Sequence, residues 1–265
     1  MTDSVLKLTV LGSGTSTGVP VLGCHCAVCS SADPRNNRTR CSALLEWSGH
    51  KVLIDTATDF RQQALREGIE RVDSVLYTHA HADHVHGIDD LRTFTLMTGE
   101  AIPVYAARGV LDRIQGLFSY IFSDADVPGY RPRLQVNEVV GPFALYGQQV
   151  LPIPLVHGPG ESLGYRVGNL AYVVDCSAIP ESSWGLLEGL DVLIIDALRF
   201  REHESHLSIS AAIEVARQLR VPKTLLTHLT HDVDYARHST GLPEGVEFAY
   251  DGQTLTLPLP GSSEL

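Results

Sequence analysis

The residues most suited to chemistry form one short string, THAHADHVHG, at positions 78–87. It follows an apolar run and holds four potential metal ligands, His79, His81, Asp83 and His84. In extended backbone, residues two apart project to the same side, so His79 and His81 can bind one ion together. Asp83 and His84 can face a second ion as the chain turns. Imidazole suits zinc, and carboxylate also admits manganese or iron, so the string predicts a divalent metal site.

Three further potential ligands each follow an apolar run of strand length directly: His157, Asp175 and His228. Alone, each of them is more often a packed histidine or a capping aspartate. Together with the string at 78–87 they complete two coordination sets. We therefore expect two divalent ions, manganese or zinc, at a place where several strands end.

A second candidate metal site lies near the N-terminus, where three of the five cysteines fall within six positions: Cys24, Cys26 and Cys29. Five cysteines are too few for a disulfide scaffold in 265 residues, and their crowding favours a metal. The alternative is that they are small buried hydrophobic residues. A tetrahedral structural zinc needs a fourth ligand. The sequence offers three candidates, namely His25, Cys41 and the distant His231.

A third signal is the loop 196–208, which follows an apolar run and leads into a helical pattern. A histidine in such a loop can donate a proton near neutral pH, and the loop offers two candidates, His203 and His206. Helix capping or surface exposure is the alternative for His206. Arg199 and Arg201 can meet an anionic substrate, although arginines beside acids more often form solvated pairs.

Around these residues, apolar runs alternate with segments of helical periodicity along the chain. The predicted strands are Lys7–Leu11, Ala43–Trp47, Val52–Ile54, Val72–Tyr77, Ile102–Tyr105, Val150–Val156, Ala171–Val174, Val192–Ile195 and Thr224–Leu226. The predicted helices are Asp59–Gly68, Val85–Met97, Ala107–Leu117 and Ser208–Leu219. The alternation predicts layered α/β architecture in a single domain, residues 1–265, with a zinc-binding loop at about 20–42. The irregular stretch Ser123–Pro142 is expected to form a flap or surface excursion.

The first predicted strand runs into the glycine-rich segment Gly12–Pro20. A dinucleotide-binding loop would be followed directly by an amphipathic helix, and no such pattern follows. We therefore interpret these glycines as a turn that needs positive φ.

The composition restricts the partners of the protein. Thirty-one acidic against 20 basic residues leave a net charge of −11, so we expect a small-molecule substrate and no long nucleic acid, whose binding depends on phosphate neutralisation. Apolar stretches stay well below the roughly 20 residues of a membrane span, and the chain does not open on a basic start followed by an apolar run. We expect a soluble, cytoplasmic protein without a membrane partner.

The HAHADH string, with isolated His, Asp and His at later strand ends, resembles the metallo-β-lactamase superfamily, whose mark is HxHxDH. The resemblance implies an αββα four-layer sandwich, two mixed β-sheets flanked by helices, with the metals at one edge of the sheets. It implies that the first ion binds His79, His81 and His157, that the second binds Asp83, His84 and His228, and that Asp175 bridges both. Asp55 matches the early aspartate with which the family supports its ligands.

The CxCxxC cluster and the segment THLTH at 227–231 resemble the PhnP-like branch, the phosphoribosyl cyclic phosphodiesterases. This resemblance implies a separate structural zinc on Cys24, Cys26, Cys29 and His231. It also implies that His206 reaches the phosphate and protonates the leaving oxygen, and it suggests a homodimer. We expect Asp83 to orient the attacking hydroxide besides binding metal.

These features favour a dinuclear metal-dependent phosphodiesterase that hydrolyses small cyclic phosphate esters by attack of a metal-bridged hydroxide. The resemblance suggests phosphoribosyl 1,2-cyclic phosphate as substrate, and 2′,3′-cyclic nucleotides as others. The main alternative is an endoribonuclease similar to the tRNA 3′-processing enzymes, although the sequence has no basic glycine-rich insertion to grip RNA. Further alternatives are a glyoxalase-type thioester hydrolase and a non-catalytic metal-binding or redox protein.

Overall fold

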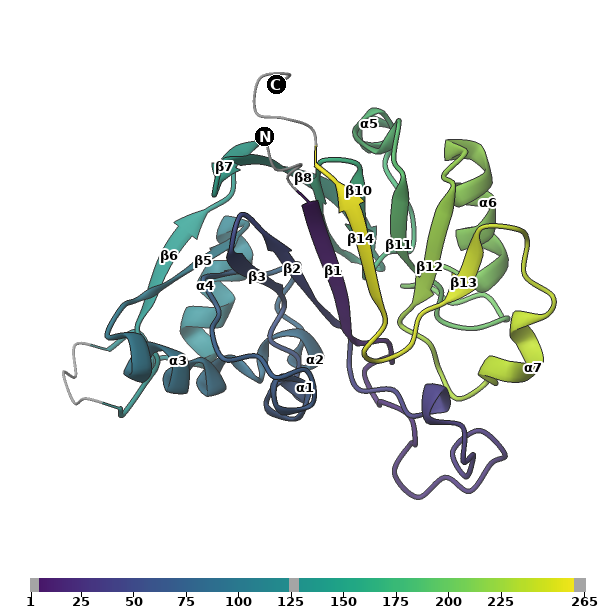
Figure 1. Ribbon diagram of the computed structural model, residues 1–265, viewed down its shortest axis with the longest axis horizontal. Coiled ribbons are helices and arrows are strands. Elements are labelled where there is room, and N and C mark those ends of the chain that lie inside the picture. Colours follow the sequence, from purple (N-terminus) through teal and green to yellow (C-terminus); the bar gives the residue numbers. More distant parts are fainter. Residues whose placement is uncertain (1–4, 124–128, 260–265) are drawn as a thin grey trace.

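The computed structural model describes residues 5–123 and 129–259, and its strands form two seven-stranded sheets (Figure 1). The first sheet has the order β14-β1-β2-β3-β4-β5-β6. Its strands are β1 (Val5–Gly12), β2 (Ser42–Trp47), β3 (His50–Ile54), β4 (Ser74–Leu76), β5 (Ile102–Ala106), β6 (Leu134–Glu138) and β14 (Thr254–Pro258). Strands β3 to β6 run parallel to one another, and β14, β1, β2 and β3 pair antiparallel, so the sheet is mixed.

The second sheet has the order β13-β12-β11-β10-β9-β8-β7 and is also mixed. Strands β10 to β13 are parallel, whereas β7 to β10 form antiparallel pairs. Its strands are β7 (Phe143–Leu145), β8 (Gln148–His157), β9 (Gly160–Val167), β10 (Leu170–Val173), β11 (Val192–Asp196), β12 (Lys223–Thr227) and β13 (Val246–Phe248).

Helices flank the pair of sheets on both outer sides (Figure 1). On the first sheet lie α1 (Phe60–Arg66), α2 (Ala82–Val85), α3 (Leu91–Thr98) and α4 (Arg108–Leu117). On the second lie α5 (Glu181–Trp184), α6 (Ile209–Leu219) and α7 (Tyr235–Ser239). Short 3₁₀ turns occupy Pro34–Asn36, Ile88–Asp90 and Gly185–Leu187. Within the described residues, each helix is too short or too polar to cross a membrane.

Successive side chains along a strand point to opposite faces of its sheet, and both faces are buried. This alternation produces the layers. In β3, Val52 and Ile54 pack between the sheets while Leu53 packs against the helices. In β11, Ile194 faces the space between the sheets and Ile195 faces the helices on the other side. Both faces of each sheet therefore bury apolar surface, which confirms the predicted αββα sandwich.

The predicted helix Val85–Met97 is wrong as one element, because the chain breaks at Gly87 into α2, a 3₁₀ turn and α3. The Gly87 amide donates to the Thr56 carbonyl at 3.0 Å. A Cβ at Gly87 would stand 2.2 Å from the carbonyl oxygen of Ala57. This close approach holds the HAHADH segment against the end of β3, and helical periodicity does not report it.

The stretch Ser123–Pro142 is also more regular than predicted. Its residues 134–138 form β6, which pairs in parallel with β5 at the edge of the first sheet. The strand is only half-buried and polar, as edge strands often are, so its apolar signal is weak. Residues 124–128 of the expected flap lie outside the described residues.

The glycine-rich segment after β1 is explained mainly by close packing. A Cβ at Gly12 would lie 1.9 Å from the Arg40 carbonyl oxygen, and one at Gly14 would lie 2.7 Å from that of Arg38. Positive φ, the predicted reason, applies to Gly18. Gly14 also bridges to Leu229, so this segment lies beside the end of β12.

Candidate metal centre

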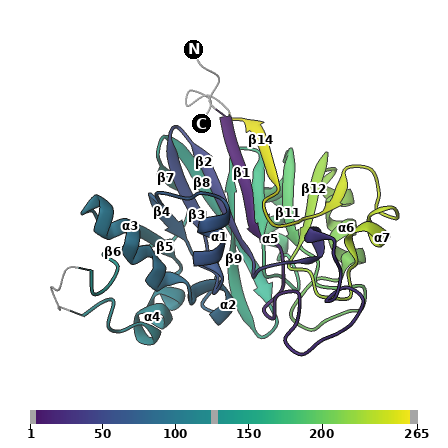
Figure 2. The same ribbon diagram turned by 60° about the horizontal axis from the view of Figure 1, so that its bottom comes forward.

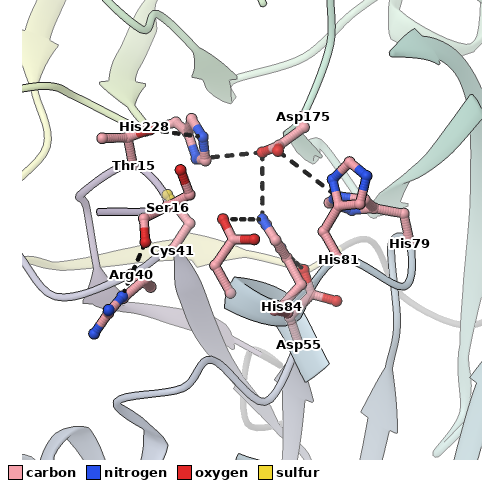
Figure 3. Close-up of polar contacts among 12 residues, drawn as sticks. Thr15, Ser16, Arg40, Cys41, Asp55, His79, His81, His84, Asp175 and His228 are labelled. Carbon is pink, nitrogen blue, oxygen red and sulfur yellow. Dashed lines mark hydrogen bonds and ion pairs between the residues drawn. The ribbon is translucent and has the colours of Figure 1, made fainter. Parts of the chain in front are cut away.

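Strand ends from both sheets meet at one edge of the sandwich, and the predicted ligands lie there. From the first sheet come Asp55, directly after β3, and the HAHADH string, which follows β4 and enters α2. From the second sheet come His157 at the end of β8, Asp175 after β10 and His228 after β12. Figure 3 shows the Asp175 carboxylate in contact with the rings of His79, His84 and His228. Residues up to 173 positions apart in the chain (55 to 228) therefore share one site.

The first group consists of His79, His81, His157 and Asp175. His81 Nδ1 lies 2.9 Å from His79 Nε2 and 3.3 Å from His157 Nε2. Asp175 Oδ2 lies 3.6 Å from His79 Nε2 and 3.7 Å from His157 Nε2. A tetrahedral zinc with bonds of about 2.1 Å separates its ligand atoms by about 3.4 Å, so this spacing fits one ion.

The second group consists of His84, Asp175 and His228. Asp175 Oδ1 lies 3.5 Å from His84 Nε2 and 3.2 Å from His228 Nδ1. All three atoms are buried and lack a hydrogen-bond partner within the described chain. Asp83 Oδ2 lies 3.5 Å from His84 Nε2. Buried polar atoms are rarely left unpaired, and a bound cation would satisfy these.

Further contacts orient the rings. His84 Nδ1 donates to Asp55 Oδ2 at 2.7 Å, and His157 Nδ1 donates to the Ser205 carbonyl at 2.8 Å. His228 Nε2 contacts the Thr15 hydroxyl at 3.3 Å. In each ring the other nitrogen then faces the cluster, which is the arrangement of metal-binding histidines.

The ionisation of these groups agrees with metal binding. Burial lowers the pKa of His79, His81 and His228, so these rings are neutral and keep a lone pair for an ion. Burial would also lower the pKa of His84, but the carboxylates of Asp175 and Asp55 outweigh it and raise that pKa. The proton on His84 balances the negative charge of Asp175 and Asp55. A bound metal cation would balance the same charge.

His206 lies at the rim of both groups, with its ring 4.7 Å from that of His228 and 4.9 Å from that of His157. Its Nδ1 donates to Asp196 Oδ2 at 2.7 Å. Burial opposes protonation, but this bond and the charge of Asp196 raise the pKa of His206. Sequence reasoning missed Asp196, whose only signal is its place at the end of an apolar strand.

The other candidate residues of the 196–208 loop, unlike His206, lie away from the metal-binding groups. His203 is exposed and its Nδ1 accepts from the Ser205 amide. Arg201 pairs with Asp232 at 3.7 Å, and Arg199 donates to the Glu202 carbonyl. Neither arginine lines the cavity around the metal-binding groups, so the expected contact with an anionic substrate has no support.

The cysteine cluster forms a separate group. His231 Nδ1 lies 3.3 Å from Cys24 Sγ, 3.6 Å from Cys26 Sγ and 3.4 Å from Cys29 Sγ. Zinc bonded to sulfur at about 2.3 Å and to nitrogen at about 2.1 Å separates such atoms by about 3.6 Å. The Cys29 amide donates to Cys26 Sγ and lowers the pKa of that thiol to about 6, which favours the thiolate that a metal needs.

The remaining candidates for a fourth zinc ligand lie elsewhere. Cys41 is buried directly before β2, with its sulfur 3.5 Å from the Thr227 hydroxyl. His25 is exposed and is not part of the cysteine group. Cys176 is buried beside Asp175, and its amide donates to Asp196.

Comparison with known proteins agrees with this geometry. Residues 50–229 match the family described as the β-lactamase superfamily domain. The chain belongs to the metallo-β-lactamase superfamily. The matched segment contains both His/Asp groups, whereas Cys24, Cys26, Cys29 and His231 lie outside it.

Two similar proteins share 41% identity with the chain. One is a solved structure described as a new diphosphatase from the PhnP family, with a TM-score of 0.91 and coverage of 96% of this chain and 98% of that one. It confirms the PhnP-like resemblance. The other is an octanoyltransferase of Porphyromonas gingivalis, matched over 93% of this chain. The chain spans about half of that protein (51%).

A more distant relative bears on the ribonuclease alternative. A ribonuclease Z of Methanopyrus kandleri is 28% identical over 78% of this chain and 86% of its own length. The superfamily and the PhnP-family relative together support a metal-dependent hydrolase.

Proposed function

We propose that this hydrolase cleaves phosphate esters of small molecules, with small cyclic phosphodiesters as its substrates. The observation that carries the proposal is the position of His206. A ring held by Asp196 at 2.7 Å borders the same cavity as two groups of metal-binding side chains. Phosphoester hydrolysis needs both elements, a site for the phosphoryl oxygens and a proton donor for the leaving oxygen.

Two divalent ions, manganese or zinc, fit the two groups of ligands. His79, His81 and His157 would hold one, and His84, His228 and Asp83 the other, with Asp175 contacting both. When bound, such ions lower the pKa of water and neutralise developing charge on phosphoryl oxygens. A third ion, zinc, fits the cysteines and His231.

The protein's own groups would then position the substrate and move protons. Asp196 orients His206 so that Nε2–H points away from the carboxylate and is free to donate to a leaving oxygen. Asp83 is buried at the cavity wall, where its carboxylate can accept a hydrogen bond from a water and orient that water for attack. The supporting contacts of Asp55 and Ser205 hold the rings still, which reduces the cost of reorganisation.

A second candidate is the hydrolysis of a phosphoanhydride in a small molecule. The relative described as a diphosphatase, at 41% identity, favours it. Phosphodiesters and diphosphates both place phosphorus between two bridging oxygens, so one site can serve either bond. The net charge of −11 argues against the endoribonuclease alternative, despite the 28% identical ribonuclease Z.

The test is a panel assay on protein loaded separately with manganese or zinc. Its substrates are phosphoribosyl 1,2-cyclic phosphate, 2′,3′-cyclic AMP, a dinucleoside diphosphate and a precursor tRNA. We expect turnover of the cyclic phosphates. Cleavage of the diphosphate alone would favour the second candidate, and cleavage of only the tRNA would refute both.

A further inference from the structure

The cavity around the His/Asp groups extends well beyond them. Its volume is about 650 Å³, within the usual range for small-molecule sites. Besides the metal-binding residues, its lining includes Gly109, Val110 and Arg113 of α4, and Glu161 of β9. Figure 2 shows α2, which carries His84, and α4 at the same edge of the sheets. One phosphate fills only part of this space, so a larger substrate would reach α4.

Arg113 is free to bind a ligand. Within the described residues its side chain takes part in no hydrogen bond or ion pair, and it is exposed. Arg108, five residues earlier in the same helix, instead pairs with Asp112 at 3.0 Å and does not line the cavity. The two arginines of α4 thus differ both in ion pairing and in whether they line the cavity.

The charges of the lining make Arg113 distinctive. Of the residues that line the cavity in the described chain, it is the sole lysine or arginine. Glu161 is the one lining carboxylate outside the metal-binding groups, and it is exposed and not paired with Arg113. An anionic part of a substrate near α4 would therefore bind to Arg113, whose planar guanidinium matches phosphate in a bidentate way.

We propose that Arg113 binds a second phosphate of the substrate, a monoester distant from the phosphorus at the metal centre. The residue would select sugar or nucleoside phosphates that carry this additional group. This inference rests on the proposed function, because it assigns the scissile phosphate to the His/Asp groups.

The experiment compares adenosine 2′,3′-cyclic phosphate with the same compound carrying a 5′-phosphate. We expect the metal-loaded protein to prefer the 5′-phosphorylated compound by about 10-fold or more in kcat/KM, as a charge-assisted contact provides. Arg113→Met should remove this preference, through loss on that compound alone, and Arg113→Lys should restore part of it. Arg108→Met is the matched control and should behave as the unchanged protein.

Two outcomes would overturn the inference. One is an absent preference in the unchanged protein, and the other is an Arg113→Met variant that loses activity equally on both compounds. If neither compound is hydrolysed, the proposed action on 2′,3′-cyclic nucleotides fails, and this failure is separate from the inference about Arg113. Calorimetric affinities for adenosine 3′,5′-bisphosphate and adenosine 3′-phosphate then decide the inference. A preference of about 10-fold that Arg113→Met abolishes supports it, and equal affinities refute it.

Discussion

The His/Asp groups and the cysteine group differ in what holds their side chains in place. The His/Asp ligands follow strands of two packed sheets, and most of them are buried. The cysteines lie in a loop without helix or strand between Val21 and Asp33, and Cys26 is exposed. Figure 1 shows this N-terminal loop, in purple, lying outside the sheets near α7.

This difference indicates two roles for metal. The His/Asp site has supporting hydrogen bonds that keep its rings oriented without an ion, as Asp55 does for His84 at 2.7 Å. In the cysteine site, the ligand atoms contact mainly one another and His231. We therefore expect ions to serve chemistry in the first site and loop structure in the second.

The largest effect on activity is expected from Asp175→Ala. This carboxylate contacts ligands of both His/Asp groups, so its loss should disrupt both ion sites. Because metal ions contribute several kcal/mol to such transition states, kcat/KM should fall by about 10³-fold or more. Metal analysis should show less active-site metal and unchanged cysteine-bound zinc. Full activity in this variant would contradict the assignment of the His/Asp site to chemistry and of the cysteine site to loop structure.

A smaller effect is expected from His206→Ala. Loss of a general acid should lower kcat by roughly 10²-fold for esters with poor leaving groups. Metal content should stay unchanged, because His206 is assigned to proton donation. Activated aryl esters are the control, since their leaving groups need no proton, and an equal loss on them would assign His206 a structural role.

Substitution of Asp55, the carboxylate that supports His84, tests how the ligands of the His/Asp site are oriented. Asp55→Asn keeps the shape of the side chain and tolerates its positive φ of 59°, but it removes the charge that faces His84. Active-site metal affinity should fall by about 10- to 100-fold, as competition with a chelator would measure. Asp89→Asn, on the surface, is the matched control and should leave affinity unchanged.

The smallest effect on activity is expected from Cys26→Ser. Zinc content should fall by one ion per chain, and the melting temperature should drop by roughly 5 °C because the loop loses its crosslink. Active-site metal should remain. His25→Asn, one residue away and outside the group, should keep the zinc. Unchanged zinc in Cys26→Ser would remove the structural site.

Much of the architecture could be predicted from local pattern. Alternating apolar runs located β2, β3, β5 and β11 and predicted the layered class correctly. Helical periodicity failed at Gly87, where a contact with Ala57 decides the break. The strands β6, β7, β9, β13 and β14 were not predicted, because most of them are short, polar or interrupted by glycine.

For the candidate site, the sequence alone indicated which residue types stand after which strands, because a strand and its end are local features. It could not determine which ring nitrogen faces the cluster, that Asp196 supports His206, or that Arg113 lines the cavity in place of Arg199 and Arg201. Those relations join residues far apart in the chain. Only the packing of the two sheets and their helices, with its close contacts and buried polar atoms, decides them.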